Sequence, residues 1–471
     1  MYDVVIIGGG IGGLMTAYGL VTKSKHKLKI AIIEQGNELV KRTCPMTSAK
    51  GACLHCHTCA ITHGIAGAGA FSDGKFNMGT AYGGTLKEEL GEELTMEYIN
   101  LLDSILTEYA TDYPNMYKSD DELKLECIRN NLTLLDMNVR HLGTDKNYDT
   151  MLALYNDLKD NYGVEMRTGA TCSLLVQATS KDKFVMELTC DKDQRDYIEA
   201  RKVVVATGRS GADFVKKLCK MFKVEVEANA VDIGVRVEMP DLIWKRFSDK
   251  IYEPKILYRT PTYGDSCRMF CFNQGGIVSA ENNGGIITAN GHSYADKSKK
   301  TQNCNFAVLS SIHFTEPFNQ PTEYAENVAR MANMIGAGNV IVQRLGDLKQ
   351  GRRTNAHRLA QCTTTPTMKA TPGDLALVLP HRVLTNIIET LEALDKVAPG
   401  TANPDTLLYG VESKYYSLKP KHNKSFELVP GLHLIGDGSG ICRGLSQSGA
   451  MGLYVADRIL GENYEDSKVK E

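Results

Sequence analysis

The chain has no apolar run long enough to cross a membrane and no marked excess of charge of either sign. A membrane span needs roughly 18 consecutive apolar residues, and no stretch of this sequence reaches that length. The 471 residues carry a formal net charge of −2, which gives no indication of nucleic acid or an anionic membrane as a partner. The apolar N-terminal stretch lacks the basic start of a secretory signal. Because the 13 cysteines are mostly scattered, we expect a cytoplasmic protein with reduced thiols.

The first residues predict a strand, a glycine-rich turn and a helix. Residues 4–7 are apolar and β-branched, as in a buried parallel strand, and residues 14–21 have a helical pattern. Between them, Gly8, Gly10 and Gly13 have G-x-G-x-x-G spacing, which permits a tight turn, close approach of a pyrophosphate and close packing of the helix. The helix N-terminus would offer free N–H groups and its positive dipole end to phosphates.

The context of this motif strengthens it. A second strand is predicted at residues 29–33 and ends in Glu34, about 20 residues on, where an acid is expected to hold a ribose hydroxyl. A second motif of this kind is lacking, because Gly336 and Gly338 have no preceding strand and no third glycine in register. The sequence therefore predicts one dinucleotide-binding domain and no dedicated nicotinamide-nucleotide domain.

Two later segments indicate which dinucleotide binds. Residues 201–209 predict a buried strand that runs into an Ala-Thr-Gly turn at 206–208, and residues 432–438 predict an apolar strand that ends in glycine and Asp437. Both segments resemble flavoproteins of the glutathione-reductase-like superfamily. The resemblance implies that the first motif binds the ADP part of FAD, that Glu34 holds the adenosine ribose and that Asp437 holds the ribityl hydroxyls.

The same resemblance implies a larger cofactor site. Residues 163–176 predict a strand that enters a small meander, where Thr171 or Cys172 would contact adenine through the main chain. The residues expected to contact FAD are Gly8, Gly10, Ile11, Gly12, Gly13, Glu34, Gln35, Arg42, Ser72, Cys172, Thr207, Gly208, Gly436, Asp437, Gly438, Leu445 and Ser446.

The segment after Asp437 is rich in small residues. Residues 438–452 are mostly glycine, serine and alanine, and a helical pattern that starts near Leu445 continues to Ile459. Small residues let a backbone lie against a flat ring, and the helix dipole would point at the flavin N1–C2=O region. The alternative is a small-residue helix that simply packs on a sheet.

A cysteine cluster follows the motif. Cys44 precedes a proline, and Cys53, Cys56 and Cys59 have C-x-x-C-x-x-C spacing. Thiols at this spacing can reach one ion, and three with a remote fourth can hold an iron–sulfur cluster. The ferredoxin pattern places its Cys-Pro downstream, whereas here it lies upstream. Three hypotheses stay open: bound iron–sulfur or zinc at these four cysteines, a dithiol that exchanges electrons with flavin, and unliganded thiols.

Motifs along nearly the whole chain make the resemblance more specific. The Cys-rich loop, the G-A-G-A-F-S-D-G-K run that ends at Lys75, residues 233–238, residues 270–276 and the C-terminal glycine motif together resemble the predicted FAD-dependent dehydrogenases, a broad bacterial and archaeal family. The family implies FAD and redox chemistry and leaves the substrate open. Its relatives often have Cys-x-Cys-Pro-Gly-Gly in the middle motif. Here Cys271 remains, but Asn273 and Gln274 replace the second Cys and the Pro.

Three residues of the later region are candidates for catalysis. Arg236, in an alternating strand, could pair with a substrate carboxylate or be a solvent-facing charge. His292, in a turn-rich segment, could transfer a proton near neutral pH or be an ordinary surface histidine. Cys271 is the third and weakest candidate.

The sequence thus predicts an α/β protein with a Rossmann-like FAD-binding domain, a helical insertion and a mixed α/β substrate domain. The expected bounds are 1–84 with the Cys-rich loop 44–59, 85–162 for the insertion, 163–235, 236–425 for the substrate domain and 426–471. We expect an FAD-dependent oxidoreductase that acts on a small molecule, with electrons supplied by the substrate, by transiently bound NAD(P)H, or by a protein carrier or cluster. The alternatives are an electron-transfer flavoprotein with a Cys-bound cluster and a non-redox FAD-binding protein.

Overall fold

The computed structural model describes residues 1–45, 56, 58–72, 74–81, 83–110, 116–135, 138–179, 183–190, 194–227, 231–251, 253–283, 285–294, 297–314, 318, 320–414 and 418–468. The chain divides into two compact units. The first unit is Met1–Asn115, Arg140–Glu227 and Ser417–Glu471, and the second is Met116–Val139 and Ala228–Tyr416.

The first unit is built on a mixed sheet with a parallel centre. The sheet has the order β22-β23-β10-β1-β2-β7, and the neighbours from β23 to β7 run parallel. An antiparallel meander of β8 and β9 extends the first half of β10. The strands are β1 (Tyr2–Ile7), β2 (Ile30–Glu34), β7 (Glu165–Thr168), β8 (Thr171–Gln177), β9 (Phe184–Thr189), β10 (Arg195–Val205), β22 (Glu427–Val429) and β23 (Leu432–Leu434).

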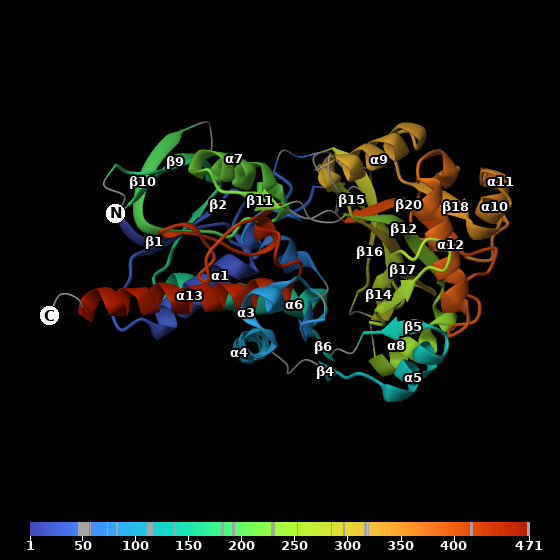
Figure 1. Ribbon diagram of the computed structural model, residues 1–471, viewed down its shortest axis with the longest axis horizontal. Coiled ribbons are helices and arrows are strands. Elements are labelled where there is room, and N and C mark those ends of the chain that lie inside the picture. Colours follow the sequence, from blue (N-terminus) through green and yellow to red (C-terminus); the bar gives the residue numbers. More distant parts are fainter. Residues whose placement is uncertain are drawn as a thin grey trace. The chain divides into compact units, whose positions relative to one another are not determined.

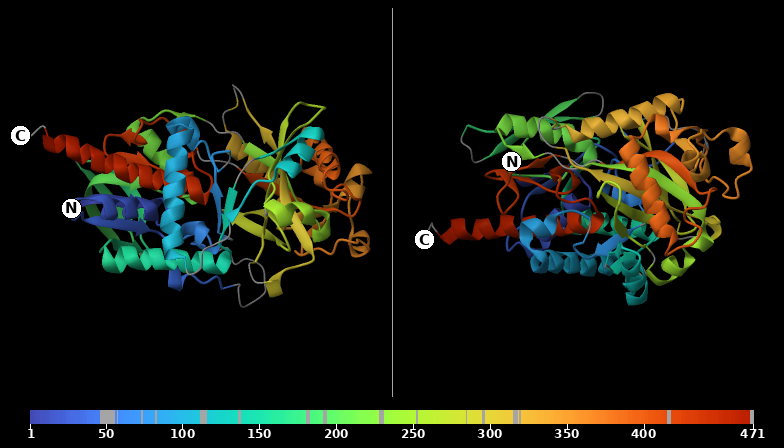
Figure 2. Two further views of the ribbon diagram at one scale, coloured as in Figure 1. Left: turned by 90° about the horizontal axis from the view of Figure 1, so that it is seen from below. Right: turned by 45° about the vertical axis from the view of Figure 1, so that its right-hand side comes forward.

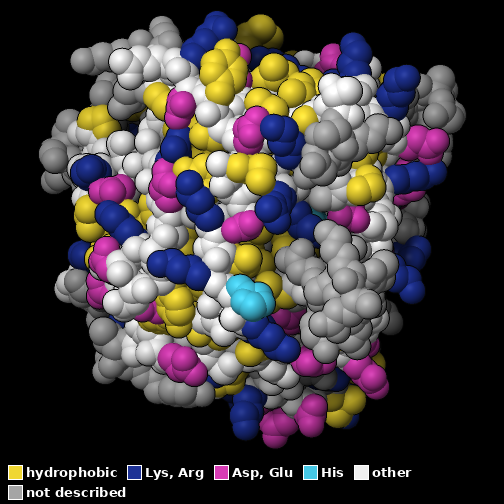
Figure 3. All heavy atoms as spheres, turned by 90° about the vertical axis from the view of Figure 1, so that its left-hand side faces the viewer, with side chains coloured by type: hydrophobic (Ala, Val, Ile, Leu, Met, Phe, Trp, Pro, Cys, Tyr) yellow, Lys and Arg dark blue, Asp and Glu magenta, His cyan; other side chains and the backbone are white. Residues whose placement is uncertain are grey.

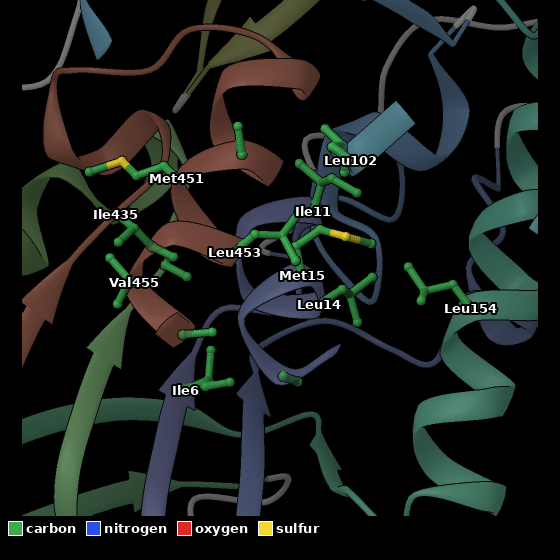
Figure 4. Packing of buried hydrophobic residues seen from close by; sticks show 14 of the residues in the cluster. Ile6, Ile11, Leu14, Met15, Leu102, Leu154, Ile435, Met451, Leu453 and Val455 are labelled. Atoms are coloured by element: carbon green, nitrogen blue, oxygen red, sulfur yellow. The ribbon is translucent and has the colours of Figure 1, made fainter. Parts of the chain in front are cut away.

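Both faces of this sheet are buried, which explains the unbroken apolar run of β1. Val4 and Ile6 point into a core shared with α1 (Ile11–Lys23) and α13 (Leu445–Lys468), two helices that lie side by side (Figure 1). Figure 4 shows Met15 of α1 close to Leu453 of α13. Val5 and Ile7 point into a second core shared with the meander and α7 (Ala212–Phe222). Side chains alternate between faces along a strand, so apolar residues at every position fit a strand covered on both sides.

Helices and short strands between β2 and β7 cover one side of the first unit. Helix α4 crosses α13 (Figure 2). The pattern over 87–109 gives two helices instead of one, because Gly91 has φ 84° and breaks the chain between them. The elements are β3 (Lys75–Met78), α3 (Leu86–Leu90), α4 (Glu92–Tyr109), β6 (Asn138–His141), α6 (Thr144–Asn156) and a π-helical turn at Asp157–Asn161; β11 (Val226–Glu227) pairs with β21 (Lys419–Pro420).

The second unit is an antiparallel sheet with helices packed on it. Its order is β19-β18-β20-β12-β17-β14-β13-β5, and only β18 and β19 pair in parallel among the described strands. The strands are β4 (Met116–Tyr117), β5 (Leu132–Leu134), β12 (Val231–Pro240), β13 (Ile256–Arg259), β14 (Ser266–Asn273), β15 (Ile277–Asn283), β16 (Ile286–His292), β17 (Asn303–Ile312), β18 (Ile341–Arg344), β19 (Thr371–Pro372) and β20 (Leu407–Lys414). The helices are α5 (Asp121–Arg129), α8 (Lys245–Ile251), α9 (Pro321–Ile335), α10 (Leu345–Lys349), α11 (Ala356–Ala360) and α12 (His381–Asp395).

Strand β12 has one apolar and one polar face. Ile233, Val235 and Val237 lie in the main core of the second unit, together with the fully buried Trp244. The opposite face carries Arg236 and Glu238, which are also fully buried. The alternation that the sequence predicts is therefore real, but its polar side chains form an internal layer. The alternative of a solvent-facing Arg236 is wrong.

The architecture confirms the predicted α/β fold class with a parallel, Rossmann-type sheet. Among the described residues, no helix has both the length and the apolar character needed to cross a membrane. On the face that Figure 3 shows, basic and acidic side chains are interspersed, in keeping with a net charge near zero.

Candidate functional site

The glycine motif forms a tight turn with open space at its centre. A Cβ on Gly13 would stand 2.1 Å from the carbonyl oxygen of Gly8, and a Cβ on Gly8, whose φ is 111°, would stand 2.5 Å from the carbonyl oxygen of Ala206. Packing therefore requires glycine at both positions. At Gly10, by contrast, no described atom lies within 4 Å of such a Cβ. Gly10 precedes the first turn of α1, whose free N–H groups and positive dipole end lie beside that space.

Two other glycines border open space in the same way. Among the described atoms, none lies within 4 Å of a Cβ placed on Gly208 or on Gly436. Gly208 ends the Ala-Thr-Gly turn after β10, and Gly436 follows β23, which pairs with β10. The amide of Gly438 donates to the carbonyl of Thr207 at 2.9 Å, so the two turns lie against each other.

Buried hydroxyls near these turns lack partners. The Oγ1 atom of Thr207 and the Oγ atom of Ser446 are buried, and neither has a hydrogen-bond partner in the part of the chain that the structure describes. A buried hydroxyl without a partner costs about 1–3 kcal/mol, so groups of this kind indicate a ligand or water that completes them. Ser446 lies in the first turn of α13, which starts at Leu445.

Glu34 lies at the end of β2, as predicted, but its carboxylate accepts hydrogen bonds from the backbone. Oε2 accepts from the amide of Gly9, and Oε1 accepts from the amides of Gly36 and Gly64, each at 2.9 Å. Glu34 is nearly fully buried. Three segments far apart in the sequence are thereby joined at one side chain.

Arg42 makes a similar set of contacts. Its guanidinium donates to the carbonyl oxygens of Ala60, Ile61, Ile65 and Gly67 at 2.6–2.9 Å. Burial lowers the pKa of Arg42 to about 10, against the opposing effect of Glu34. Arg42 therefore stabilises the backbone of residues 60–67.

Asp437 is partly exposed and has a cationic neighbour. Its Oδ2 atom lies 3.2 Å from Nε of Arg209, which is more exposed. Asp437 starts a short 3₁₀ turn that follows directly on Gly436. Asp437 therefore lies beside the Ala-Thr-Gly turn, to which the amide of Gly438 is hydrogen-bonded.

The other predicted cofactor residues have mixed surroundings. Ile11 is buried in the core, and a Cβ on Gly12 would stand 3.2 Å from the carbonyl oxygen of Ser448, so Gly12 lets α1 and α13 approach. Ser72 donates to the carbonyl of Gly69 at 2.8 Å. Cys172 is buried, which raises the pKa of its thiol to about 12. Gln35 is half-buried beside Glu34.

The Cys-rich segment is described only in part. Cys53 lies outside the described residues, Cys56 is exposed, and Cys44 and Cys59 are half-buried. Within the described ranges, no group of three or more His, Cys, Asp or Glu side chains is placed to hold a metal ion. Burial would raise the pKa of the Cys59 thiol, but the backbone amides of Thr62 and Ile61 outweigh it, so this pKa lies below its ordinary value.

In the second unit, Arg236 is the centre of a buried polar cluster. Its Nε donates to Oδ1 of Asn305 at 2.8 Å, and its Nη2 donates to the carbonyl of Cys271 at 2.9 Å. Burial would lower the pKa of Arg236, but Cys271 and Glu412 beside it raise the pKa above its ordinary value. The Nε and Nη2 atoms of Arg236 are thus engaged within the protein.

Several polar atoms of this cluster have no hydrogen-bond partner within the described residues. They are Nη1 of Arg236, Nδ2 of Asn305 and both carboxylate oxygens of Glu412. Glu412 is fully buried, and its Oε2 lies 3.6 Å from Nη1 of Arg236, an ion pair too long for a direct hydrogen bond. Lys414 lies 3.5 Å from the other oxygen. At these separations a water or a polar ligand group could bridge the charges.

The three predicted catalytic residues lie in one neighbourhood of this unit. The Sγ atom of Cys271 is 3.7 Å from Nη2 of Arg236, and Cys271 has φ 54° at an irregularity in the pairing of β14 with β17. His292 ends β16 and is thus part of a strand, although the sequence places it in a turn-rich segment. A Cβ on the adjacent Gly291 would stand 2.3 Å from Nη2 of Arg236. Their catalytic roles stay predictions.

Sequence reasoning missed Glu412 and Asn305. Each lies in a strand that also carries other polar residues, and neither belongs to a motif. Burial of both residues depends on strand pairing, since Glu412 pairs with Gly234 and Asn305 with Glu238. The available signal was an acid that directly follows the mostly apolar residues 407–411 of β20.

A protein-family model matches most of the second unit. Residues 230–415 match the family "FAD-dependent protein, C-terminal domain-like". This match confirms the predicted resemblance to FAD-dependent proteins for that part of the chain. No curated protein sequence matches the chain significantly.

Solved structures of flavoproteins align with almost the whole chain at low identity. Aklavinone-11 hydroxylase in complex with FAD and aklavinone has a TM-score of 0.42 and 10% identity, covering 98% of this chain and 62% of its own. L-proline dehydrogenase from P. horikoshii has a TM-score of 0.41 and 12% identity, covering 98% of this chain and 94% of its own. Glycine oxidase from Bacillus cereus has a TM-score of 0.39 and 13% identity, covering 98% of this chain and 96% of its own. This chain thus spans less than two thirds of the hydroxylase. Because these TM-scores are low, fold and function are inferred from the residues of this chain.

The residues of the first unit fit the cofactor that the family description names. FAD requires a turn that its pyrophosphate can approach, and Gly10 borders open space at the N-terminus of α1. It also requires donors and acceptors for its ribityl and ring atoms, and Thr207 and Ser446 have buried hydroxyls without partners among the described residues. The fit supports FAD as the ligand of this unit.

Proposed function

We propose that this protein is an FAD-dependent oxidoreductase that acts on a small organic molecule. The observation that carries the proposal is the glycine turn at the start of α1, where no described contact fills the place of a Cβ on Gly10, together with the buried hydroxyls of Thr207 and Ser446, which lack partners among the described residues. The match of residues 230–415 to an FAD-dependent family supports it.

Each part of this site has a proposed role. The free N–H groups of α1 beside Gly10 would bind the pyrophosphate, and Asp437 would accept hydrogen bonds from the ribityl hydroxyls. The first turn of α13, at Leu445 and Ser446, would stabilise negative charge on a reduced ring. FAD, when bound, supplies the hydride or electron transfer, while these groups hold and orient it.

The substrate and the electron donor are matters for experiment. We propose that the substrate binds through the second unit, whose polar cluster contains Arg236, Cys271 and Glu412. Electrons could come from the substrate, from transiently bound NAD(P)H or from a protein carrier. Flavin bleaching in an anaerobic sample, with NADH, NADPH, reduced ferredoxin or a panel of small metabolites, tests the proposal. If dithionite reduces the flavin but no physiological donor does and no substrate reoxidises it, the protein is a non-redox FAD-binding protein instead.

The substitution Asp437→Ala is expected to weaken FAD binding by about 1.5–3 kcal/mol, because it removes a charge-assisted hydrogen bond. Titration of FAD into flavin-free protein measures the change. Arg209→Met is the matched control, since it removes the cationic neighbour at 3.2 Å but keeps the carboxylate. Equal affinity of Asp437→Ala and the wild type would show that this carboxylate does not bind the cofactor.

We also propose a metal or iron–sulfur centre at Cys44, Cys53, Cys56 and Cys59. Its motivation is the C-x-x-C-x-x-C spacing, together with the lowered pKa of the Cys59 thiol, since thiolates are the form that binds metals. Such a centre could relay electrons to FAD, which would make the protein an electron-transfer flavoprotein.

Metal analysis of anaerobically purified protein tests that centre. Cys56→Ser is expected to lower the iron or zinc content, and iron with acid-labile sulfide would identify a cluster. Cys190→Ser, a half-buried cysteine of the β9–β10 connection, is the control. Wild-type protein that is free of metal and has titratable thiols in this segment would eliminate the centre.

A further inference from the structure

Two charged side chains of the first unit, Glu34 and Arg42, direct almost all their hydrogen bonds at the backbone of the chain itself. We propose that they are positioning residues, which hold residues 59–67 against the glycine turn and so fix one wall of the cofactor site. On this proposal Glu34 is not the two-point ribose ligand that its place after β2 suggests. The statement about the cofactor rests on the proposed function, but the statement about the backbone does not.

The carboxylate of Glu34 has little capacity left for a ligand. A carboxylate offers about four acceptor positions, and three are taken by the amides of Gly9, Gly36 and Gly64 at 2.9 Å. Oε1 already accepts two hydrogen bonds. A ribose diol that binds a carboxylate through both hydroxyls needs two acceptor positions. It would therefore have to displace an amide that is held in a buried site.

The guanidinium of Arg42 is committed in the same manner. An arginine has five N–H donors, and four contacts to backbone carbonyls use Nε, Nη1 twice and Nη2. These carbonyls come from a segment of eight residues, Ala60 to Gly67. The side chain is nearly fully buried, and its charge lies near that of Glu34. Both residues thus contact one loop, Glu34 through the amide of Gly64 and Arg42 through four carbonyls.

The segment that they hold lies directly against the glycine turn. The amide of Ala66 donates to the carbonyl of Gly9 at 2.8 Å, and Ala66 has φ 69°, which is unusual for a residue with a Cβ. A Cβ on Gly67 would stand 3.3 Å from Cα of Gly10, so no larger residue fits easily there. The wall beside Gly10 is therefore built by a loop whose position depends on Glu34 and Arg42.

The contacts of Glu34 and Arg42 with residues 59–67, which we call the clamp, also join the Cys-rich segment to the cofactor site. Residues 59–67 begin at Cys59, whose carbonyl accepts from the amides of Thr62 and His63 at 3.2 and 2.9 Å. Any change that shifts Cys59 would act on the wall beside Gly10 through this short, tightly bonded loop.

Hydrogen exchange on flavin-free protein tests the clamp without requiring any enzymatic activity. Glu34→Gln replaces an acceptor oxygen by an NH₂ group, and it is expected to speed exchange in peptides covering residues 58–72 by at least about tenfold. Arg42→Lys, which keeps the charge but loses the fork, is expected to do the same and serves as the second variant if the first folds poorly. Glu38→Gln is the control, because Glu38 forms ion pairs with the exposed Lys41 and Lys159. Unchanged exchange in both clamp variants would overturn the proposal.

Nucleotide binding distinguishes a positioning role of Glu34 from a role in binding the ribose. Wild type and Glu34→Gln are titrated with ADP and with 2′-deoxy-ADP. If Glu34 is a positioning residue, the variant binds both more weakly and the ratio of the two affinities stays as in the wild type. If Glu34 binds the ribose, the preference for ADP disappears in the variant, which overturns the proposal. A wild type that binds neither ADP nor FAD would contradict the proposed function, while the exchange result would still decide the clamp.

Discussion

Replacing Arg236 by methionine is expected to lower the free energy of unfolding of the second unit by about 3–5 kcal/mol. Arg236 and Glu412 are both fully buried, and their charges lie 3.6 Å apart. Methionine fills a similar volume but leaves the buried Glu412 carboxylate with one cation fewer, so that Lys414, 3.5 Å away, is its remaining described ion-pair partner. It also removes one donor each from the Oδ1 atom of Asn305 and the carbonyl of Cys271, which would keep only the amide of Asn273 at 3.1 Å among their described side-chain donors. A buried charge that loses part of its compensation is costly in a protein interior.

The chain offers a specific probe for this measurement. Trp244 is its only tryptophan, and it lies in the core of the second unit against Phe247, Phe272 and Phe306. Tryptophan fluorescence during urea unfolding therefore reports on this unit alone. Arg330→Met is the matched control, because Arg330 is an exposed arginine of the same unit that pairs with Glu326 on α9. Such surface pairs contribute about 0–1 kcal/mol.

A double variant distinguishes the charge from the loss of packing. Arg236→Met combined with Glu412→Gln removes both charges, so it is expected to recover a large part of the lost stability. If Arg236→Met shifts the fluorescence transition no more than Arg330→Met does, the buried pair contributes little to stability. If the double variant is no more stable than the single one, the loss comes from packing or from the Asn305 and Cys271 contacts.

The first unit could be predicted largely from the sequence, since its signals are local. The run before Gly8 is apolar at every position because both faces of β1 are covered, and such a run is typical of a buried parallel strand. Gly8 and Gly13 are required by contacts within one turn, which makes their spacing visible in the sequence. The place of Glu34 was predicted as well.

What Glu34 binds could not be predicted, because its partners come from distant segments. Gly64 lies 30 residues further on, and its amide reaches Glu34 only once the loop has folded back over β2. The buried cluster of the second unit was hidden for a similar reason. An alternating strand such as β12 predicts which side chains share a face, but the cover of that face by β16 is a property of the tertiary structure. The sequence alone therefore could not decide whether Arg236 faces solvent or the interior.

Alanine substitutions at two glycines of the motif are expected to have opposite effects: Gly13→Ala should lower folding stability, whereas Gly10→Ala should lower the affinity for FAD. Gly13→Ala is expected to destabilise the first unit by about 1–3 kcal/mol or more, because the new Cβ would stand 2.1 Å from the carbonyl oxygen of Gly8 and both backbones are fixed. Gly10→Ala is expected to change folding stability by no more than about 1 kcal/mol, since alanine is only a poorer residue at the start of a helix. Its backbone, with φ −71° and ψ 179°, suits any residue.

Although Gly10→Ala is expected to have little effect on folding stability, we expect it to weaken FAD binding strongly. No described atom lies within 4 Å of a Cβ at Gly10, so the methyl group would enter the space that the pyrophosphate needs. We expect the affinity for FAD to fall at least about tenfold, or about 1.4 kcal/mol, in a protein that unfolds nearly as the wild type does. Circular dichroism of flavin-free protein and titration with FAD measure the two quantities. Gly461→Ala, whose Cβ also has open space around it but lies near the end of α13, should leave the affinity unchanged. If Gly10→Ala binds FAD as tightly as this control does, the space beside Gly10 is not where the cofactor phosphates bind, and the site must be sought elsewhere.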